Sequence, residues 1–430
     1  MSGPGRDAKR PAAADPSALA ERAAAAVDAD RLVAWTQALV RIRSVVDPER
    51  GSSEQEAATW VADTLRELGF SPTIEEVAPG RPNVICDWSG SRFDPERHRT
   101  LMFEGHTDVV TEGDRASWSV DPFGGAIDGD RLYGRGAADM KGGVAAAIAA
   151  LCAVREVAPD LPGRIRLGIV VDEEGMMSGI KSFIENGWAR EVDGAIVCEP
   201  EENELCLVQK GALRLHVRVV GAMAHGAMPY AGVNPVRGLA HFLVALEELE
   251  QREQQRLGEH PHLGRPWITP TMMRAPDGGT PQLNVMPGNA YQAIDVRTVP
   301  GQDHDALLAE IQAAARATEA GTPGLTIEVE CFASRPWTET AADDPLVSAL
   351  AAAYPGTIGG PARYGGVPGA TDGTFLSAWA QVPIVTVGPG DRTIPHQSDE
   401  FVRVPDLILA ARLYAAAAVR YLGEAESAPS

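Results

Sequence analysis

The chain has 430 residues, a formal net charge of −21, 44% hydrophobic residues and 23% charged residues. This length exceeds what one hydrophobic core supports, so we expect a soluble globular protein of two domains. The excess of negative charge repels phosphate backbones and anionic lipids, which argues against nucleic acid or a membrane surface as a partner. No stretch approaches the roughly 18 apolar residues of a membrane span.

The cysteines and the N-terminal segment indicate a cytoplasmic protein. Five scattered cysteines without a CxxC pair fit reduced thiols better than a disulfide framework. Residues 1–16 are rich in Ala, Pro and charged residues and contain no apolar stretch. They therefore predict a disordered tail and not a signal peptide.

The first half of the chain alternates predicted helices with short apolar strands. We expect a helix over 53–68, a buried strand at 101–103, an Ala-rich helix at 142–157, and buried strands at 167–171 and 195–197. This alternation predicts an α/β fold with a mostly parallel sheet. In such sheets, ligands bind beyond the carboxyl ends of the strands.

The pattern changes after Lys210. Apolar and polar residues alternate over 213–219, which predicts a strand with one buried face and one solvent-exposed face. Next come a helix at 235–256, a loop rich in Pro and Gly, a strand at 291–299, a helix at 306–318 and a strand at 325–331. This β-α-β-α-β pattern predicts a small α+β domain.

The α/β pattern returns at the end of the chain. It predicts a helix near Leu346, a buried strand at 383–387 and a final helix at 407–422. We therefore predict a discontinuous catalytic domain of residues 17–210 and 333–430, with residues 211–332 inserted as a lid and dimerisation domain.

Imidazole and carboxylate groups follow several predicted strands and should meet at one rim of the sheet. They are His106, Asp108, Asp139, Glu173, Glu174, Glu199 and His396. Such groups repel one another or stay hydrated unless a cation holds them together. Imidazole and carboxylate suit Zn²⁺, with Co²⁺ or Mn²⁺ as alternatives. Two ions roughly 3.5–4 Å apart need a bridging carboxylate and terminal ligands on each ion.

Two spacings within this set indicate how neighbouring residues divide their roles. Asp108 stands two residues after His106, so it can accept the ring N–H and fix the tautomer. Glu173 and Glu174 are adjacent and point in different directions, so one can bind metal while the other stays free as a base.

The motifs GHTDVV, GRGAADMKGG, DEEG, CEP and PHQSDEF occur in this order along the chain. Together they resemble the di-zinc metallopeptidase family that includes succinyl-diaminopimelate desuccinylase, acetylornithine deacetylase, aminoacylase and carboxypeptidase G. The resemblance spans Arg31 to the last helix and includes the inserted domain.

The resemblance implies a role for each matching residue. It makes Asp139 the bridge between two ions, with His106 and Glu199 completing one metal site and Glu174 and His396 the other. It makes Asp108 the residue that orients His106, and Glu173 the general base acting on a metal-bridging water.

The resemblance also implies roles for three residues of the inserted domain. His225 is similar to a histidine that reaches the partner subunit's active site in a homodimer and stabilises the oxyanion. Asn284 and Arg297 resemble residues that hold the substrate, and a guanidinium is the natural bidentate partner of a carboxylate. The alternative for Arg297 is a surface residue paired with Asp295.

One motif departs from the desuccinylase type. Those members carry a Gly-Thr-Ser-Asp-Gly-Arg-Phe run where residues 369–375 read Gly-Ala-Thr-Asp-Gly-Thr-Phe. The first Thr and the Arg are missing, which argues against a succinylated diacid as the substrate.

The predicted function is a metal-dependent amidohydrolase, a deacylase of a small N-acyl amino acid or related N-acyl amine. A dipeptidase or carboxypeptidase with the same two-metal mechanism is the alternative. A non-catalytic binding protein on this scaffold is a remote third possibility, because no predicted ligand or base is missing. The sequence does not determine which acyl group and which amine the substrate contains.

Overall fold

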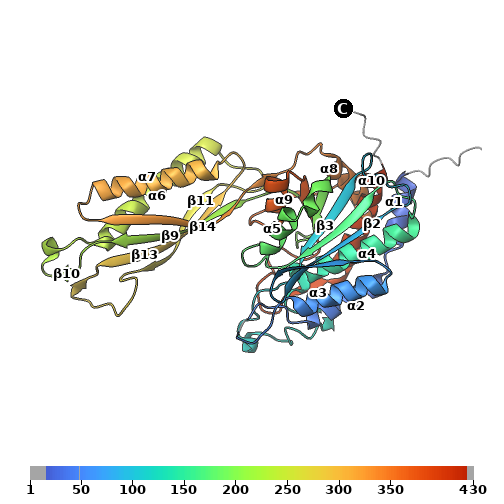
Figure 1. Ribbon diagram of the computed structural model, residues 1–430, viewed down its shortest axis with the longest axis horizontal. Helices are drawn as coiled ribbons and strands as arrows, with labels where there is room; N and C mark the ends of the chain where they lie inside the picture. Colours follow the sequence, from blue (N-terminus) through green and yellow to red (C-terminus); the bar gives the residue numbers. More distant parts are fainter. Residues whose placement is uncertain (1–15, 48, 424–430) are drawn as a thin grey trace, which may run out of the picture.

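The computed structural model describes residues 16–47 and 49–423, which form two bodies (Figure 1). The larger body holds the long central sheet and most of the helices. The smaller body, here called the inserted unit, consists of residues 211–335. The predicted tail of residues 1–16 lies outside the described residues except for Pro16, which begins the first helix.

A nine-stranded sheet crosses the larger body in the order β1-β2-β6-β3-β7-β17-β8-β15, with β16 beside β8. The ladders β6·β3, β3·β7 and β7·β17 in its middle are parallel, whereas most ladders toward both edges are antiparallel. The predicted mostly parallel α/β sheet is thus confirmed for the four central strands. The strands are β1 (Thr73–Ala78), β2 (Arg81–Ser89), β3 (Thr100–His106), β6 (Arg164–Val170), β7 (Gly194–Val197), β8 (Leu205–Gln209), β15 (Thr338–Glu339), β16 (Tyr364–Val367) and β17 (Ile384–Thr386).

Helices cover both faces of this sheet, which explains why every residue of β3 and of β6 is buried. One face is packed by α1 (Pro16–Ala25), α2 (Ala29–Arg41), α3 (Gln55–Glu67), α4 (Gly142–Val157), α8 (Pro345–Thr357) and α10 (Val404–Gly423). The other face is packed by α5 (Ser178–Glu185) and α9 (Gly373–Ala380). Short turns are η1 (Arg115–Ser117), η2 (Ala137–Lys141), η3 (Trp188–Glu191) and η4 (Pro229–Ala231).

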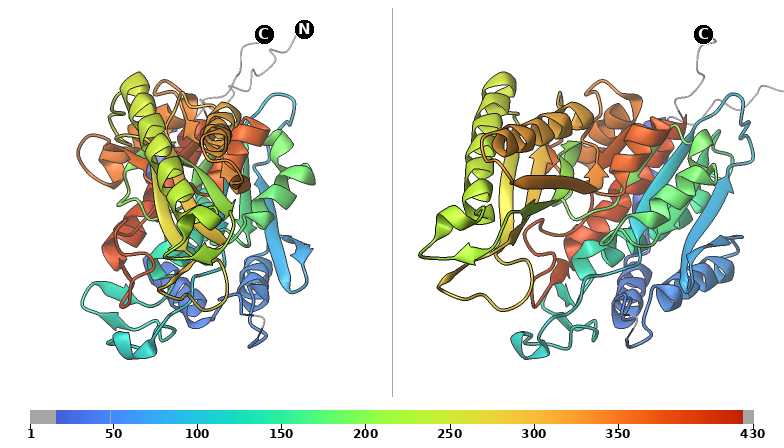
Figure 2. Two further views of the ribbon diagram at one scale, coloured as in Figure 1. Left: turned by 90° about the vertical axis from the view of Figure 1, so that its left-hand side faces the viewer. Right: turned by 60° about the vertical axis from the view of Figure 1, so that its left-hand side comes forward.

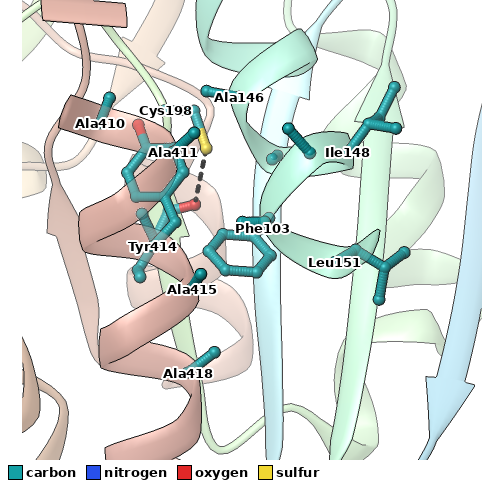
Figure 3. Packing of buried hydrophobic residues seen from close by; sticks show 14 of the residues in the cluster. Phe103, Ala146, Ile148, Leu151, Cys198, Ala410, Ala411, Tyr414, Ala415 and Ala418 are labelled. Atoms are coloured by element: carbon teal, nitrogen blue, oxygen red, sulfur yellow. Dashed lines mark hydrogen bonds between the residues drawn. The ribbon is translucent and has the colours of Figure 1, made fainter. Parts of the chain in front are cut away.

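Alternate residues of β3 pack on opposite faces of the sheet. The ring of Phe103 lies between α4 and α10, with its centroid 5.4 Å from that of Tyr414 (Figure 3). Small side chains on α10, among them Ala411 and Ala415, let this helix lie close to the sheet. Met102 belongs to the cluster on the α5 side. This packing fixes β3 and therefore fixes the place where it ends, at His106.

The segment Ala137–Val157 is long and apolar enough to cross a membrane by length and composition alone. However, 89% of its apolar window is buried inside the protein. That burial is typical of a core helix, and α4 does pack against the sheet beside α10.

The inserted unit contains an antiparallel sheet in the order β11-β13-β9-β14, with helices α6 and α7 on one face (Figures 1 and 2). Its elements are β9 (Gly211–Val220), α6 (Pro235–Leu257), β11 (Trp267–Arg274), β13 (Asn289–Thr298), α7 (His304–Ala320) and β14 (Thr326–Arg335). The predicted three-strand pattern was incomplete, because β11 falls in the stretch expected to be a loop. This edge strand buries none of its residues fully and contains Pro270, so it has no clear alternation.

Two smaller sheets complete the fold. An antiparallel pair of short strands, β10 (Ala224–His225) and β12 (Val285–Met286), lies at the end of the inserted unit that is far from the larger body (Figure 1). The second sheet joins β18 (Phe401–Arg403), β5 (Arg131–Tyr133) and β4 (Ile127–Asp128).

Candidate active site

The carboxyl ends of the central parallel strands meet at one rim, and the predicted metal-binding residues lie there. His106 is the last residue of β3, Glu173 and Glu174 follow β6, and Glu199 follows β7. Asp139 lies in η2, immediately before α4, and His396 lies in the loop after β17.

Glycines bring the start of α4 against the end of β7. A Cβ atom on Gly143 would lie 2.0 Å from the carbonyl oxygen of Cys198, so no larger residue fits there. Gly136, just before η2, has a φ of +83°, a conformation that glycine adopts most readily. This close approach places Asp139 in one group with His106 and Glu199.

The imidazole and carboxylate side chains form two groups that share Asp139. In the first, His106 Nε2 lies 3.2 Å from Asp139 Oδ1 and 3.6 Å from Glu199 Oε1. In the second, His396 Nε2 lies 3.0 Å from Glu174 Oε1 and 3.5 Å from Asp139 Oδ2. In each group the three donor atoms lie within 4.8 Å of one another. The two oxygens of Asp139 therefore face two different histidines.

Asp108 lies against His106 and makes further contacts that were not predicted. The ring Nδ1 of His106 lies 3.0 Å from the main-chain carbonyl oxygen of Asp108 and 3.4 Å from its carboxylate. The carboxylate also accepts the main-chain amides of Glu173 (3.2 Å) and Glu174 (3.0 Å). Asp108 thus contacts the histidine and also anchors the Glu173–Glu174 segment.

Glu400 anchors Asp139 in a similar way, although it was not among the predicted site residues. Its Oε1 accepts the main-chain amides of Ala138 and Asp139, each over 3.1 Å. The guanidinium of Arg135 pairs with its other oxygen. A carboxylate at the end of the PHQSDEF motif therefore positions the segment that carries Asp139.

Burial and surplus negative charge shift the pKa values of these groups. Burial, with the carboxylate of Asp139 nearby, raises the pKa of Glu199 to about 8. Burial also raises the pKa of Glu173 well above its usual range. Hydrogen bonds to Asp139 and Glu174 raise the pKa of His396 to about 10. The cluster therefore attracts positive charge, which protons supply when no metal ion does.

Two further buried carboxyl groups lie close enough to influence this cluster, and sequence reasoning missed them. Glu104 belongs to β3, and Asp372 lies immediately before α9. Burial raises the pKa of Glu104 to about 8 and that of Asp372 well above its usual range. Within the described residues, neither oxygen of Asp372 has a hydrogen-bond partner. Total burial of an acidic side chain cannot be read from its sequence neighbours.

A cavity of about 380 Å³ opens beside the cluster. Asp139, Glu173, Glu174 and Glu199 line one side of it, and residues 367–371 contribute another part of the wall. The inserted unit contributes three arginines to the lining: Arg214, Arg297 and Arg335. Only Arg297 was predicted. Its Nε lies 2.8 Å from Asp295 Oδ1, so Arg297 makes the ion pair of the alternative interpretation and also borders the cavity.

His225 and Asn284 do not line this cavity. His225 pairs with Val285 in the antiparallel β10·β12 ladder, and the amide of Gly226 donates to the carbonyl of Asn284 over 2.7 Å. Both residues are exposed at the end of the inserted unit that lies far from the larger body (Figure 1). Within one chain they are therefore separated from the strand-end cluster.

Comparison with protein families gives a match over residues 102–420 to the peptidase family M20/M25/M40. The chain belongs to this family. Family membership makes it a metal-dependent hydrolase acting on amide bonds, and the strand-end cluster is its candidate metal centre.

Curated relatives in the family are succinyl-diaminopimelate desuccinylases. The protein from Gluconobacter oxydans is 31% identical, over 89% of this chain and 96% of that protein. The protein from Methylobacterium radiotolerans is also 31% identical, over 88% of this chain and 93% of that protein.

Solved structures of family members share the fold. The M20 family metallo-carboxypeptidase Sso-CP2 from Sulfolobus solfataricus has a TM-score of 0.73 at 18% identity, covering 91% of this chain and 99% of that one. Human carnosine dipeptidase 1 has a TM-score of 0.70 at 21% identity, covering 95% and 100%. A dinuclear metal-binding M20 peptidase from Bacillus subtilis has a TM-score of 0.65 at 17% identity, covering 92% and 98%.

Proposed function

We propose that the chain is a two-metal deacylase that hydrolyses the amide bond of a small N-acyl amino acid or related N-acyl amine. The observation that carries this proposal is the position of Asp139, whose two oxygens face His106 and His396 in two adjoining groups. One carboxylate shared by two sets of ligands is the arrangement that a pair of ions requires.

The donor set fits two divalent cations. We assign His106, Asp139 and Glu199 to one ion and Asp139, Glu174 and His396 to the other. Imidazole and carboxylate ligands favour Zn²⁺, with Co²⁺ or Mn²⁺ as alternatives. When bound, such ions polarise an amide carbonyl and lower the pKa of a water molecule.

Glu173 is the proposed general base. Its side chain is buried, lines the cavity and stands beside the two ligand groups. Burial and neighbouring carboxylates raise its pKa, so its carboxylate oxygen can accept a proton from the attacking water. It then delivers that proton to the nitrogen of the leaving amine. Asp108 is the proposed positioning residue for His106 and for the segment that carries Glu173.

We further propose that the inserted unit acts as a lid and joins two chains into a homodimer. His225 and Asn284, far from their own chain's cavity, would then serve the partner's site. The edge strand β11 supports this, because Trp267, Met272 and Met273 are each about half exposed on it. Apolar side chains on an open strand edge favour pairing with another chain. Arg297 would bind a carboxylate of the substrate.

The expected setting is the cytoplasm, with a small acylated molecule as substrate and neither nucleic acid nor membrane as a partner. The desuccinylase relatives support a deacylase, because their names describe removal of an acyl group. The carboxypeptidase and dipeptidase with similar folds support the alternative, cleavage of a short peptide at the same centre.

A substrate screen tests the proposal. The purified protein, supplied with zinc or cobalt, is given N-acetyl, N-formyl and N-succinyl amino acids beside dipeptides of the same residues. The proposal expects release of free amino acid from at least one N-acyl series at a higher kcat/KM than from the dipeptides. Faster cleavage of dipeptides would favour the peptidase alternative, and hydrolysis of neither class would overturn both.

A further inference from the structure

Three arginines lie on one face of the sheet of the inserted unit. Arg297 on β13 and Arg335 on β14 are both paired in register with Ala212 on the central strand β9, one on each side. Arg214 stands two residues further along β9. Residues paired directly across antiparallel strands share a face, as do residues two apart on one strand. All three guanidinium groups therefore project from the face opposite α6 and α7.

The face that carries these arginines closes one side of the 380 Å³ cavity. Glu173, Glu174 and His396 belong to the lining of this cavity too. A molecule with its amide at the strand-end cluster would thus extend toward the three guanidinium groups.

The positive charge of this face is only partly balanced. Arg297 pairs with Asp295 over 2.8 Å, and Arg335 donates from Nη2 to the carbonyl of Gly175 over 2.7 Å. The guanidinium of Arg214 has no hydrogen bond or ion pair with any of the described residues, although Arg214 is paired in register with Asp295. Burial lowers the pKa of Arg335, and the like charges of Arg214 and Arg297 lower it further. Like charges gathered in a cavity are stabilised when an anion binds between them.

An alternative explanation for the three gathered arginines is that acidic residues across the cavity balance their charge, because Glu173 and Asp372 attract Arg335. However, the proposed function assigns Asp139, Glu174 and Glu199 to two metal ions and keeps Glu173 free as a base. Among the described residues, Asp295 is then the carboxylate that forms an ion pair with one of the three guanidinium groups, that of Arg297. A second anion from the substrate would supply the missing charge.

We infer that Arg214 and Arg335 form a second anion subsite beside Arg297, so that the preferred substrate is an N-acyl amino acid carrying two carboxylates. This inference rests on the proposed function and deepens it. The hydroxyl of Thr374, which stands where the desuccinylase-type run has arginine, donates to the carbonyl of Pro336, the residue after Arg335. The segment that carries Arg335 is therefore fixed by the residue that replaces that arginine.

The second carboxylate can belong to either part of the substrate, and three compounds separate the possibilities. N-acetylmethionine has one carboxylate, N-acetylglutamate has two on the amine side, and N-succinylmethionine has one on each side of the amide. We expect one of the two dianionic compounds to have the highest kcat/KM in the metal-loaded enzyme.

The test variant is Arg214→Gln, since removal of this unpartnered side chain leaves no buried group unpaired. We expect a loss of roughly ten- to hundredfold in kcat/KM on the preferred dianion, chiefly through KM, as befits a lost charge-assisted contact. The loss on N-acetylmethionine should stay within about twofold. Arg214→Lys should recover part of the loss because it keeps the charge.

Arg218→Gln is the matched control, because Arg218 is an exposed arginine on the same strand and face, four residues from Arg214. Titration calorimetry of the metal-loaded protein with glutarate gives a readout independent of turnover. Binding should weaken in Arg214→Gln and stay unchanged in Arg218→Gln.

Equal losses on mono- and dianionic substrates, or equal glutarate affinity in both variants, would overturn the inference. The proposed function would still stand if N-acetylmethionine were hydrolysed. Conversely, if no N-acyl compound is hydrolysed, the proposed function fails, and the glutarate titration still decides whether the anion subsite exists.

Discussion

The carboxylate of Asp108 accepts the main-chain amide of Glu174 over 3.0 Å, and its other oxygen accepts the amide of Glu173 over 3.2 Å. A single side chain thus sets the position of a proposed metal ligand and of the proposed base. Because the main-chain carbonyl of Asp108 also lies 3.0 Å from His106 Nδ1, both ligand groups depend on this residue.

Replacement of Asp108 by Asn should disturb the site without removing a ligand. The amide nitrogen of Asn cannot accept a hydrogen bond, so one of the two main-chain amides loses its partner. We expect metal affinity and turnover to fall by roughly 10–100-fold, as for other residues that orient metal ligands. Metal titration and kcat measure this effect. Asp114→Asn is the control, because Asp114 accepts a main-chain amide in an exposed turn, and equal behaviour of the two variants would remove the positioning role.

Substitution of the two adjacent glutamates should separate base from ligand. Glu173→Gln keeps the shape of the side chain and removes its basicity, so turnover should collapse by roughly 10²–10⁴-fold while both metal ions remain bound. Glu174→Gln should instead reduce the metal content of the purified protein. Metal analysis and kcat on the same samples distinguish the two effects. Near wild-type turnover in Glu173→Gln would show that the base has been misassigned.

Mixed dimers test whether His225 acts on the partner's site. Loss of an oxyanion donor lowers turnover by roughly 10²–10³-fold, so His225→Ala alone should be nearly inactive. When it is mixed with inactive Glu173→Gln and subunits exchange, one site in each mixed dimer has an intact base and an intact partner histidine. Activity should therefore reappear. A mixture that stays inactive after exchange has been verified would place His225 in its own chain's chemistry or outside catalysis.

The ion pair of Arg43 and Glu112 gives a prediction about stability that is separate from catalysis. Arg43 donates to both carboxylate oxygens of Glu112, over 3.2 and 3.0 Å. Burial alone would raise the pKa of Glu112, but these hydrogen bonds and the positive charge of Arg43 hold it below its usual value.

A carboxyl with a lowered folded-state pKa stabilises the fold above its unfolded pKa, and this contribution is lost as pH falls through the folded value. Glu112→Gln should therefore destabilise the protein by about 1.5–3 kcal/mol at pH 7, and the difference from wild type should shrink below about pH 4. Thermal unfolding across this pH range measures it, with Glu67→Gln, an exposed position at the end of α3, as control. A difference that is independent of pH would exclude the ion pair as its source.

The residues at the strand ends could be predicted from sequence because a buried apolar run marks each strand and the motif residues follow it directly. His106, Glu174 and Glu199 are examples. The contacts of Asp108 could not be predicted in the same way, because its carboxylate bonds to amides of a segment 65 and 66 residues away. Long-range contacts of this kind depend on packing that no local pattern encodes.

The arginines of the cavity illustrate a second limit. The alternation over 213–219 predicted that Arg214 lies on a solvent-exposed face of the strand. The buried Leu213 and Leu215 confirm the alternation itself. Arg214 nevertheless borders the cavity, because the larger body closes over that end of the sheet. The edge strand β11 was missed for the opposite reason, since an exposed strand with a proline has no buried face to reveal it.

Hydrolysis should depend on two metal ions held by the Asp139 cluster. The most direct measurement removes all metal by chelation, verifies its absence by elemental analysis, and then follows activity while zinc or cobalt is added back. Circular dichroism before and after chelation serves as a check on folding. We expect an inactive, folded metal-free protein whose activity returns fully at two ions per chain. Full activity in a verified metal-free sample would show that hydrolysis does not need the metal ions.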